Sequence, residues 1–290
     1  MNDYLAVVRG GALTTVQDLG RPGFAHLAVP HSGALDVPAM RLANRLVGNP
    51  ESSAVLETTL DGVALKPGRL CHIAVTGAIS DVRINGRHAA WALPLLVRAG
   101  EVLEVGRALY GVRSYIAVNG GIAVAPTMGS RSTDLLTGLG PVIVHTESLL
   151  PIGPAFGAPA QIDFAPYPVP GKEIILNCFL GPRDDRITEE SIALLRSAVW
   201  TVGAQSNRIG LRIEGPTLHL RTNNELPSEG LVLGSVQVPP DGMPIVFLAD
   251  HPTTGGYPVI GVVPAPDIWR CAQATVGSAI RFNLKRLPAL

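Results

Sequence analysis

Glycine and proline punctuate this sequence so often that few long helices can form. The 290 residues contain 32 glycines and 25 prolines, and these fall between short runs of aliphatic and β-branched residues. Proline interrupts helices and central strands, and glycine permits the tight turns that join short strands. The pattern is typical of barrels and sandwiches, so we predict a mainly β fold with a few short helices.

The densest cluster of these residues indicates a domain boundary. Residues 151–172 contain six prolines and three glycines, too many to continue a ladder or a helix. A chain of this length can fill the cores of two medium domains. We therefore predict an N-terminal domain over residues 1–150, a linker over 151–172 and a C-terminal domain over 173–290.

Two segments carry helix signals. The first has Asp36 as N-cap and Pro38 in the first turn, and it ends at Gly48. The second begins at Thr188 and has two glutamates in its first turn. These are the two helices that the sequence predicts.

Hairpin signals concentrate in the first half. Asn85-Gly86 follows an alternating run and tolerates the positive φ of a type I′ turn. Asp61-Gly62 lies similarly between two apolar runs, so residues 55–105 are predicted to form an antiparallel meander. A further strand is expected over residues 114–119, ending at Gly120-Gly121.

Charge and cysteine content narrow the function classes. The formal net charge is zero and only 16% of residues are charged, so nothing draws the chain to nucleic acid or to an anionic membrane. A small neutral or zwitterionic substrate or another protein fits better. The N-terminus lacks signal-peptide regions, no apolar run reaches membrane-spanning length, and three separated cysteines argue against a disulfide framework. We expect a cytoplasmic protein.

Several familiar site signatures are absent from the sequence. There is no GxxxxGK[ST] loop for ATP, no Met-Lys dipeptide for covalent biotin and no GxSxG elbow. The seven histidines show no HxH, HxxxH or HExxH spacing, so we expect no metal site. What remains are four polar clusters inside apolar, glycine-broken segments.

The first two clusters lie in the N-terminal half. One, over residues 14–36, holds Gln17, Asp18, Arg21, His26, Ser32 and Asp36. Its alternative interpretation is a loop held by Asx-type turns. The other, over residues 119–133, includes Arg131 and Ser132, whose guanidinium and hydroxyl are suited to an anionic substrate. Its alternative is a loop whose hydroxyls cap local backbone.

The third cluster, SNRIGLRIEG at residues 206–215, alternates charged and apolar residues. Period 2 places Arg208 and Arg212 on one strand face, and such charges require carboxylate partners, for which Glu214 and Glu229 are the candidates. Asn207 precedes them as a candidate substrate ligand. The alternative is a surface ladder of ion pairs.

The fourth cluster covers residues 234–258. Gln237 interrupts one strand, Asp250 ends the apolar strand IVFLA, and a loop with Thr254 and Tyr257 follows directly. A carboxylate at a strand end beside a glycine-bent polar loop is a common small-molecule site. The alternative is an aspartate that only stabilises its turn. We predict Asp250, Arg208, Glu229 and Gln237 as catalytic residues, and Arg131, Ser132, Asn207, Arg212, Thr254 and Tyr257 as substrate ligands.

Taken in order, these motifs resemble the family variously named allophanate hydrolase subunit 2, biotin-dependent carboxyltransferase subunit and C-type subunit of 5-oxoprolinase, which is urea amidolyase-related. The segments that carry the resemblance are LTTVQDLGRPGFAHLAVPHSGALD, RLANRLVGNP, LETTLDGVAL, VTGA, YIAVNGGI, GSRSTD, SNRIGLRIEG, LPSEGLVLGSVQVPPDGMPIVFLAD and TTGGYP. The resemblance implies two cyclophilin-like β-barrel domains. It also implies a companion of the allophanate hydrolase subunit 1 type, which corresponds to the B-type subunit of 5-oxoprolinase, within a hetero-oligomer.

Three functions follow from the resemblance as alternatives. The first is a subunit of an ATP-dependent 5-oxoprolinase, which cleaves 5-oxo-L-proline to L-glutamate; a stand-alone chain without a biotin-carrier segment resembles this group best. The second is a carboxyltransferase of urea-amidolyase type, with biotin supplied by a partner. The third is a non-catalytic regulator of a kinase inhibitor.

One loop departs from the family pattern. After the GSRST segment the family usually has Gly-Arg and then a Gly-Asp turn, whereas this chain has DLLTGLGPVIVHTESLLPIG, with Glu147-Ser148 in place of Gly-Asp. The resemblance therefore assigns no role to residues 134–153.

Overall fold

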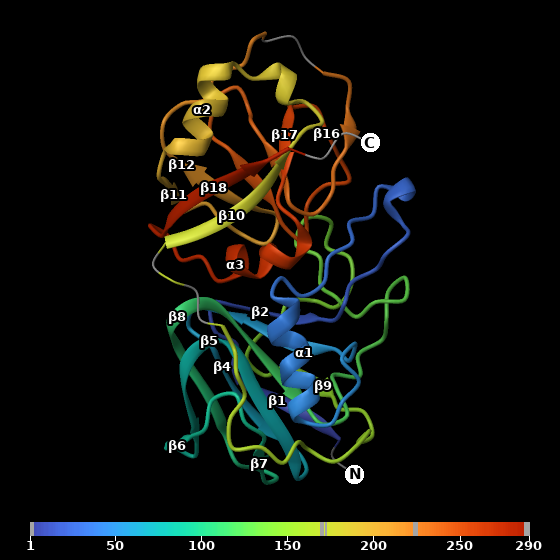
Figure 1. Cartoon of the computed structure of the whole chain (residues 1–290). Coiled ribbons are helices and arrows are strands. Elements are labelled where there is room, and N and C mark those ends of the chain that lie inside the picture. Colours follow the sequence, from blue (N-terminus) through green and yellow to red (C-terminus); the bar gives the residue numbers. More distant parts are fainter. Residues whose placement is uncertain (1–2, 169–170, 172, 223–225, 287–290) are drawn as a thin grey trace. The chain divides into compact units, whose positions relative to one another are not determined.

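The computed structural model describes residues 3–168, 171, 173–222 and 226–286 (Figure 1). Two compact units make up the chain. Unit 1 comprises Met1–Arg21, Ser32–Asp134 and Gly138–Val169, and unit 2 comprises Pro22–His31, Leu135–Thr137 and Pro170–Leu290. Two short segments of the N-terminal half thus belong to unit 2, which a simple division near residues 151–172 does not include.

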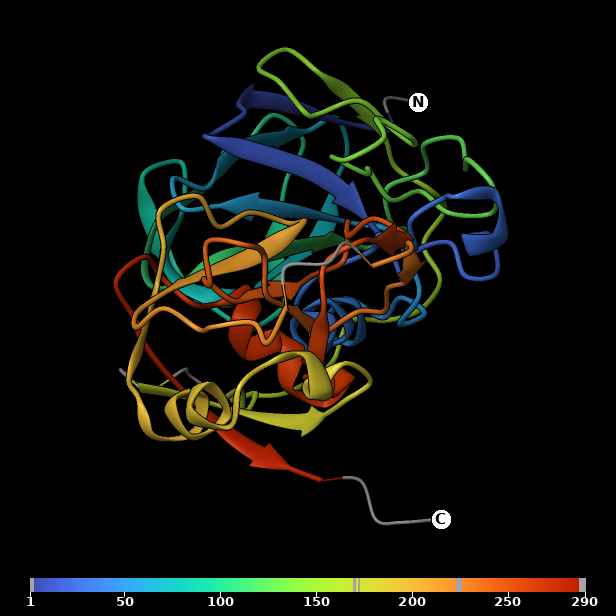
Figure 2. The same cartoon turned by 90° about the horizontal axis from the view of Figure 1, so that it is seen from above.

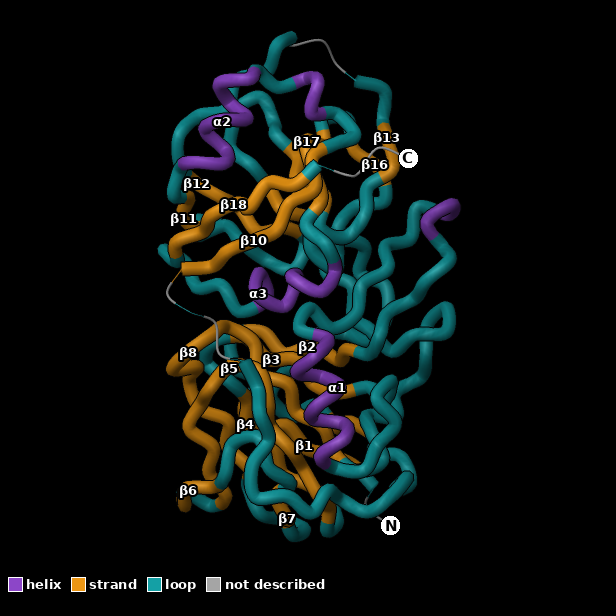
Figure 3. The backbone as a smooth tube through the Cα atoms, viewed as in Figure 1, coloured by secondary structure: helices purple, strands orange, loops and turns teal. Residues whose placement is uncertain are grey.

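Strands dominate both units, and the helices are few and short (Figure 3). The predicted mainly β fold is confirmed. One unit contains a closed barrel and the other a curled sheet.

Unit 1 is built on a nine-stranded sheet in which β2, β3, β8, β4, β1 and β9 follow one another and β5 extends the sheet from β8. Its strands are β1 (Tyr4–Arg9), β2 (Leu13–Gln17), β3 (Val55–Thr59), β4 (Val63–Pro67), β5 (Cys71–Ile84), β6 (Arg87–Ala89), β7 (Leu95–Val97), β8 (Leu103–Val118) and β9 (Leu149–Pro151).

The Asp61-Gly62 dipeptide does not close a hairpin, so the predicted meander is wrong at this point. Both β3 and β4 pair with the same strand, β8, and they follow each other along it. Gly62 has φ +67°, and a Cβ there would lie 2.0 Å from the Val105 carbonyl oxygen. A Cβ on Gly11 would lie 1.8 Å from the Gly62 carbonyl oxygen in turn. Glycine is therefore needed where backbones approach closely as the sheet curls.

The Asn85-Gly86 hairpin is confirmed. Asn85 has φ +49° and Gly86 φ +76°, as a type I′ turn requires, and β5 pairs antiparallel with β6 across it. The strand predicted over residues 114–119 is the end of the longer β8. β5 and β8 pair along most of their length, interrupted by shifts of register.

The helix α1 (Val37–Leu46) packs on the sheet of unit 1 and has the predicted N-cap. The Asp36 side chain accepts a hydrogen bond from the Ala39 N–H at 3.0 Å, and a proline occupies the first turn. Buried Ala39, Met40 and Ala43 form its apolar face. This predicted helix is confirmed.

Most of the segment rich in proline and glycine belongs to unit 1 and packs within it. The Ala160 N–H donates to the Leu46 carbonyl at 2.9 Å, the Asn119 side chain donates to the Gly157 carbonyl at 2.9 Å, and Ala165 is buried. Residues 153–168 thus have irregular structure. Backbone groups of this segment make hydrogen bonds to other parts of unit 1 that are not part of a β-sheet.

Unit 2 contains a closed barrel of seven strands in the order β10, β17, β14, β15, β12, β11 and β18. Its elements are η1 (Ala25–Leu27), β10 (Glu173–Leu180), η2 (Asp184–Arg186), α2 (Glu189–Ser197), β11 (Trp200–Val202), β12 (Gly210–Glu214), β13 (Glu229–Gly230), β14 (Ser235–Gln237), β15 (Ile245–Phe247), β16 (Thr254–Gly255), β17 (Val259–Val262), η3 (Ala265–Asp267), α3 (Ile268–Ala272) and β18 (Ala279–Lys285).

The barrel of unit 2 closes through a parallel pair. β10 and β18 run side by side in parallel from the Glu173–Ala279 pair to the Phe179–Lys285 pair (Figure 2). The predicted second helix is confirmed as α2, whose N-cap Thr188 accepts a hydrogen bond from the Ser191 N–H. Trp200 is fully buried, donates its indole N–H to the Leu195 carbonyl of α2 at 3.4 Å and packs edge to face against Phe282.

Cys71, Cys178 and Cys271 are all buried and unpaired with one another. Burial raises the pKa of the Cys178 thiol to about 12. Among the residues that the structure describes, no group of His, Cys, Asp and Glu side chains is arranged to hold a metal ion. The described helices are all too short or too polar to span a membrane.

Candidate functional site

Asp18 is the centre of a buried polar cluster in unit 1. Its Oδ1 accepts hydrogen bonds from the Ser130 and Ser132 hydroxyls, both at 2.6 Å, and from the Gly20 N–H at 2.8 Å. Its Oδ2 accepts from the Arg131 N–H at 2.6 Å. The loop predicted to offer donors to a substrate anion thus gives these donors to a carboxylate of its own unit.

The two predicted substrate ligands of this loop are held by internal contacts. Ser132 is completely buried, and besides donating to Asp18 its hydroxyl accepts a hydrogen bond from the Asp18 N–H at 3.0 Å. Arg131 directs its Nε to the Val124 carbonyl at 2.7 Å. The Ser130 and Ser132 hydroxyls thus donate to a carboxylate 112 and 114 positions away in the chain, which differs from the alternative in which they cap only local backbone.

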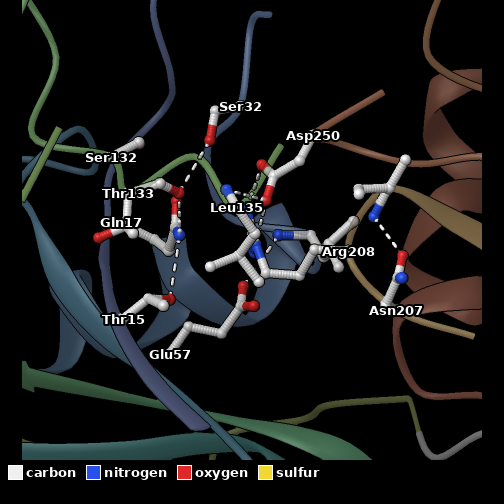
Figure 4. Close-up of polar contacts among 12 residues, drawn as sticks. Thr15, Gln17, Ser32, Glu57, Ser132, Thr133, Leu135, Asn207, Arg208 and Asp250 are labelled. Atoms are coloured by element: carbon white, nitrogen blue, oxygen red, sulfur yellow. Dashed lines mark hydrogen bonds and ion pairs between the residues drawn. The ribbon is translucent and has the colours of Figure 1, made fainter. Parts of the chain in front are cut away.

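Gln17 and Arg21 bind consecutive backbone carbonyls beside this cluster. The Gln17 amide nitrogen donates to the Thr133 carbonyl at 2.9 Å and to the Thr15 hydroxyl at 3.0 Å (Figure 4). An Arg21 Nη2 hydrogen bond reaches the Ser132 carbonyl. Ser32 also donates to the Thr133 carbonyl, at 3.1 Å.

Some polar atoms of this region are buried without a hydrogen-bond partner. Gln17 is 0% exposed and Arg21 is 1% exposed. Within the described part of the chain, Oε1 of Gln17 and both Nε and Nη1 of Arg21 have no partner. Buried polar atoms are nearly always paired, so this exception requires an explanation.

A second buried network in unit 1 connects α1 to the sheet. The Tyr115 hydroxyl donates to Glu57 Oε2 at 2.7 Å and accepts from the Asp36 N–H at 2.8 Å. Burial, reinforced by the negative charges of Glu57 and Asp36, raises the pKa of Tyr115 well above its ordinary value. The phenol therefore stays protonated, and the network has a structural role at the start of α1.

In unit 2, Arg208 and Asp250 form a buried two-point ion pair. The Arg208 Nε lies 2.9 Å from Asp250 Oδ2, and its Nη2 lies 2.9 Å from Oδ1 (Figure 4). The Leu135 N–H also donates to Oδ2, at 3.1 Å. The side chains are 1% and 0% exposed. The sequence predicted these two residues together, and the structure places them in contact.

The prediction that Arg208 and Arg212 share a strand face is wrong. β12 begins only at Gly210, and the Asn207 side chain accepts the N–H groups of Ile209 at 2.8 Å and Gly210 at 3.2 Å, which forms an Asx turn before the strand. Arg212 is exposed within the strand, whereas Arg208 is buried before it. Parity along a strand applies only inside the strand.

Glu229 pairs with Arg183 instead of Arg208. The Arg183 Nε lies 2.9 Å from Glu229 Oε1 and 3.1 Å from Oε2. This guanidinium lowers the pKa of Glu229 below its ordinary value. Sequence reasoning missed Arg183, because no periodicity connects a residue after a Gly-Pro pair to a carboxylate that is 46 positions away.

Gln237, Thr254 and Tyr257 lie around the small β13–β16 sheet. The Gln237 amide donates to the Tyr257 carbonyl at 3.0 Å, and a Cβ on Gly255 would lie only 2.8 Å from that amide nitrogen. Thr254 is exposed and pairs with Gly230 in the ladder. Six of the eight predicted residues of unit 2 form two sets: Arg208 with Asp250, and Gln237, Glu229, Thr254 and Tyr257 around β16. The other two, Asn207 and Arg212, are in neither set, since Asn207 holds its own Asx turn and Arg212 is exposed on β12.

Comparison with known proteins identifies the class. The model of the family "carboxyltransferase domain, subdomain A and B" matches residues 27–284. The chain therefore belongs to this carboxyltransferase-domain family, as the sequence motifs indicated.

Individual relatives are similar over nearly the whole chain. The C-type subunit of the 5-oxoprolinase of Escherichia coli (strain K12) is 39% identical over 283 residues, which cover 96% of this chain and 90% of that protein. The corresponding 5-oxoprolinase subunit from Haemophilus influenzae is 33% identical, covering 93% of this chain and 87% of that protein.

Larger proteins contain the same fold as one part. The crystal structure of the K. lactis urea amidolyase matches with a TM-score of 0.88 and 30% identity, covering 97% of this chain but 18% of that chain. The urea amidolyase of Lachancea kluyveri is 32% identical over 95% of this chain and 16% of that protein.

Proposed function

We propose that this chain is the C-type subunit of a 5-oxoprolinase that opens 5-oxo-L-proline to L-glutamate with ATP, together with companion subunits. The observation that carries the proposal is the 39% identity to the corresponding 5-oxoprolinase subunit of Escherichia coli, because the match covers 90% of that protein. The urea amidolyases share the fold, but the chain corresponds to less than a fifth of their length.

Companion subunits are part of the proposal. The relatives' names denote one subunit of an enzyme, and we propose a companion of the B type of 5-oxoprolinase or of the allophanate hydrolase subunit 1 type. We propose that the complex uses ATP. Because this sequence contains no P-loop, it does not indicate which subunit binds the ATP. Covalent biotin is not expected on a chain without a Met-Lys dipeptide. Three buried cysteines that form no disulfide with one another are compatible with the proposed cytoplasmic location.

We propose Asp250 as an orienting residue of the site, with Arg208 as its positioning partner. Both carboxylate oxygens already accept hydrogen bonds, so removal of a substrate proton by Asp250 would require the ion pair to open. Gln237, Glu229, Thr254 and Tyr257 are proposed to contribute around β16. Of these, Tyr257 has the most accessible side chain, 50% exposed.

The test is reconstitution with the genetically neighbouring subunits. We expect the complex to release glutamate from 5-oxoproline with ATP, and the chain alone to release none. If the complete complex released no glutamate but transferred the carboxyl group of a carboxybiotin-bearing carrier to urea, leaving biotin on the carrier, the carboxyltransferase function would replace the proposal. That second candidate is favoured by the TM-score of 0.88 to the urea amidolyase structure.

The role of Asp250 is tested in the same complex with Asp250→Asn. We expect kcat/KM to fall by about 100-fold or more if the carboxylate orients substrate. The matched control is Asp241→Asn, since Asp241 is exposed and its side chain accepts the Met243 N–H of its own turn. Near-wild-type turnover of Asp250→Asn would rule out the proposed role.

A further inference from the structure

We propose that Arg21 of unit 1 binds the carboxylate of a small ligand, and that Gln17 Oε1 accepts a hydrogen bond from an N–H group of the same ligand. This inference rests on the proposed function for the ligand's identity and adds a binding site to it. Neither residue was among the site residues that the sequence predicted.

The charge of Arg21 is the first argument. A guanidinium is protonated at all relevant pH values, and burying it without a carboxylate is costly. Arg21 is 1% exposed and forms no ion pair with any described residue, and its Nη2 bond to the Ser132 carbonyl leaves Nε and Nη1 unpartnered. A bound carboxylate would supply both the charge and two acceptor oxygens.

The nearest carboxylate along the chain cannot supply them. Asp18 lies three positions before Arg21, and its two oxygens accept four hydrogen bonds from hydroxyl and backbone donors. These contacts fix Asp18 on the loop of Ser130 and Ser132. The unpaired N–H groups of Arg21 therefore point to an external anion.

Gln17 provides the second argument because its orientation is fixed. Its amide nitrogen donates to Thr15 and to Thr133, so the two hydrogens are used and Oε1 must be the atom without a partner. Gln17 and Arg21 bind the consecutive carbonyls of Thr133 and Ser132. The unpartnered acceptor and the unpartnered donors thus belong to one small region of unit 1.

Gly140 provides the third argument. Its φ is +89°, and a Cβ at this position would lie 2.0 Å from the Ser132 carbonyl oxygen and 3.0 Å from Arg21 Nη2. The turn is held by the Thr133 hydroxyl, which donates to the Pro141 carbonyl at 2.9 Å. Glycine at position 140 therefore lets the backbone approach the Ser132 carbonyl and the Arg21 guanidinium, where a side chain would collide with both.

These requirements select a class of ligand. The ligand needs a carboxylate for the arginine and an N–H donor for the amide oxygen. A ring amide with a carboxyl group has both, and 5-oxoproline, the substrate of the proposed function, is such a compound. A neutral amide such as urea would leave the charge of Arg21 without a counterion.

The experiment measures binding of three ring compounds to the full chain by isothermal titration calorimetry. 5-Oxoproline has both groups, pyrrolidin-2-one lacks the carboxylate, and 1-methyl-5-oxoproline lacks the N–H. We expect saturable binding of 5-oxoproline, an affinity at least about 10-fold lower without the carboxylate and about 5–10-fold lower without the N–H. Equal binding of 5-oxoproline and pyrrolidin-2-one, or no saturable binding by the chain or its complex, would overturn the proposal.

Variants test the residue itself. Arg21→Lys keeps the charge but removes the planar fork, and we expect it to weaken 5-oxoproline binding about 10-fold and to raise KM in the complex. The matched control is Arg69→Lys in the same unit, because Arg69 already pairs with Asp3 at 2.9 Å. The control should bind like the wild type. Unchanged binding by a folded Arg21→Lys would contradict the proposal, and the ligand series on the wild type decides the matter if this variant does not fold.

The two proposals fail in different ways. If the complex releases glutamate and Arg21→Lys leaves KM unchanged, the carboxylate site is wrong and the proposed function stands. If the chain discriminates the three compounds as expected but the complete complex releases no glutamate, the site stands and the proposed function is wrong.

Discussion

Arg21 in unit 1 and Arg208 in unit 2 are each 1% exposed, and the two guanidinium groups have different surroundings. Arg208 in unit 2 has a carboxylate at 2.9 Å from each of two nitrogens, whereas Arg21 in unit 1 has one carbonyl and two nitrogens without a partner. The carboxylates differ in the same way: Asp250 is neutralised by a cation, and Asp18 is surrounded by hydroxyl and backbone donors. The ion pair of unit 2 is complete without a ligand, whereas the unpartnered donors of Arg21 in unit 1 are suited to binding one.

The largest effect is expected from opening the closed pair. Arg208→Met leaves Asp250 buried without its cation, so we expect the free energy of unfolding to fall by about 3–5 kcal/mol. Urea denaturation measures it, with exposed Arg212→Met as a control that should change stability by less than about 0.5 kcal/mol. The double variant Arg208→Met/Asp250→Leu should be more stable than Arg208→Met. If it were less stable, the comparison would fail in unit 2.

Asp18→Asn tests how much the neutral hydroxyl and backbone N–H donors around Asp18 contribute to stability. One oxygen becomes an NH2 group that faces donors, so we expect a loss of about 1–3 kcal/mol in the free energy of unfolding. No cation is left unpaired, which is why the cost should be below that of Arg208→Met. The same urea series measures it, and a cost of about 5 kcal/mol would show that Asp18 compensates a buried positive charge.

Arg21→Met tests directly whether the two buried arginines, Arg21 and Arg208, contribute differently to stability. The substitution removes a buried charge that has no carboxylate partner among the described residues, together with one hydrogen bond to Ser132. We expect a cost of about 1 kcal/mol or less without ligand, several-fold below that of Arg208→Met. Thermal unfolding with and without 5-oxoproline measures it, and the ligand should stabilise the wild type only. Equal costs for the two arginines would remove the distinction.

The smallest effect concerns an exposed pair of unit 2. Because Arg183 lowers the pKa of Glu229, the pair contributes stability above the ordinary pKa of a glutamate and loses it as the pH falls through the lowered value. Carboxyl 13C chemical shifts should show the lowered pKa, and Arg183→Lys should move it upward. Arg212→Lys should leave it in place. A Glu229 pKa at its ordinary value would mean that the pair does not persist in solution.

Local signals were sufficient where structure is local. The caps at Asp36 and Thr188 and the Asn85-Gly86 turn depend on residues within a few positions, and all three are confirmed. Asp61-Gly62 has the same local signature, but its flanking strands pair with β8, about 40–60 positions away. The Asp-Gly dipeptide does not specify β8 as the pairing partner, because the same dipeptide also occurs where a curled sheet bends.

The site residues show the same difference between features that depend on nearby residues and features that depend on distant contacts. Asp250 and Arg208 were chosen because a carboxylate ended an apolar strand and an arginine required a partner, and the pair exists. Glu229 was assigned to the same arginine, yet it binds Arg183. Arg21 and Gln17 lay within a recognised polar cluster, but only burial and a count of donors and acceptors distinguish them from Asp18. Those quantities are properties of the folded chain.

The assignment of Leu135–Thr137 to unit 2 has a consequence for synthesis on the ribosome. The Leu135 N–H donates to Asp250, which is 115 positions later in the chain. During translation the Leu135 N–H leaves the ribosome long before Asp250 is synthesised. Until then this N–H can only hydrogen-bond to water or to other groups. The hydrogen bond between Leu135 and Asp250 can therefore form only after residue 250 has been synthesised. A gene divided near residue 170 would produce a second half that lacks Leu135 and its N–H donor to Asp250. The second half should therefore recover its native state only when the first half is also present.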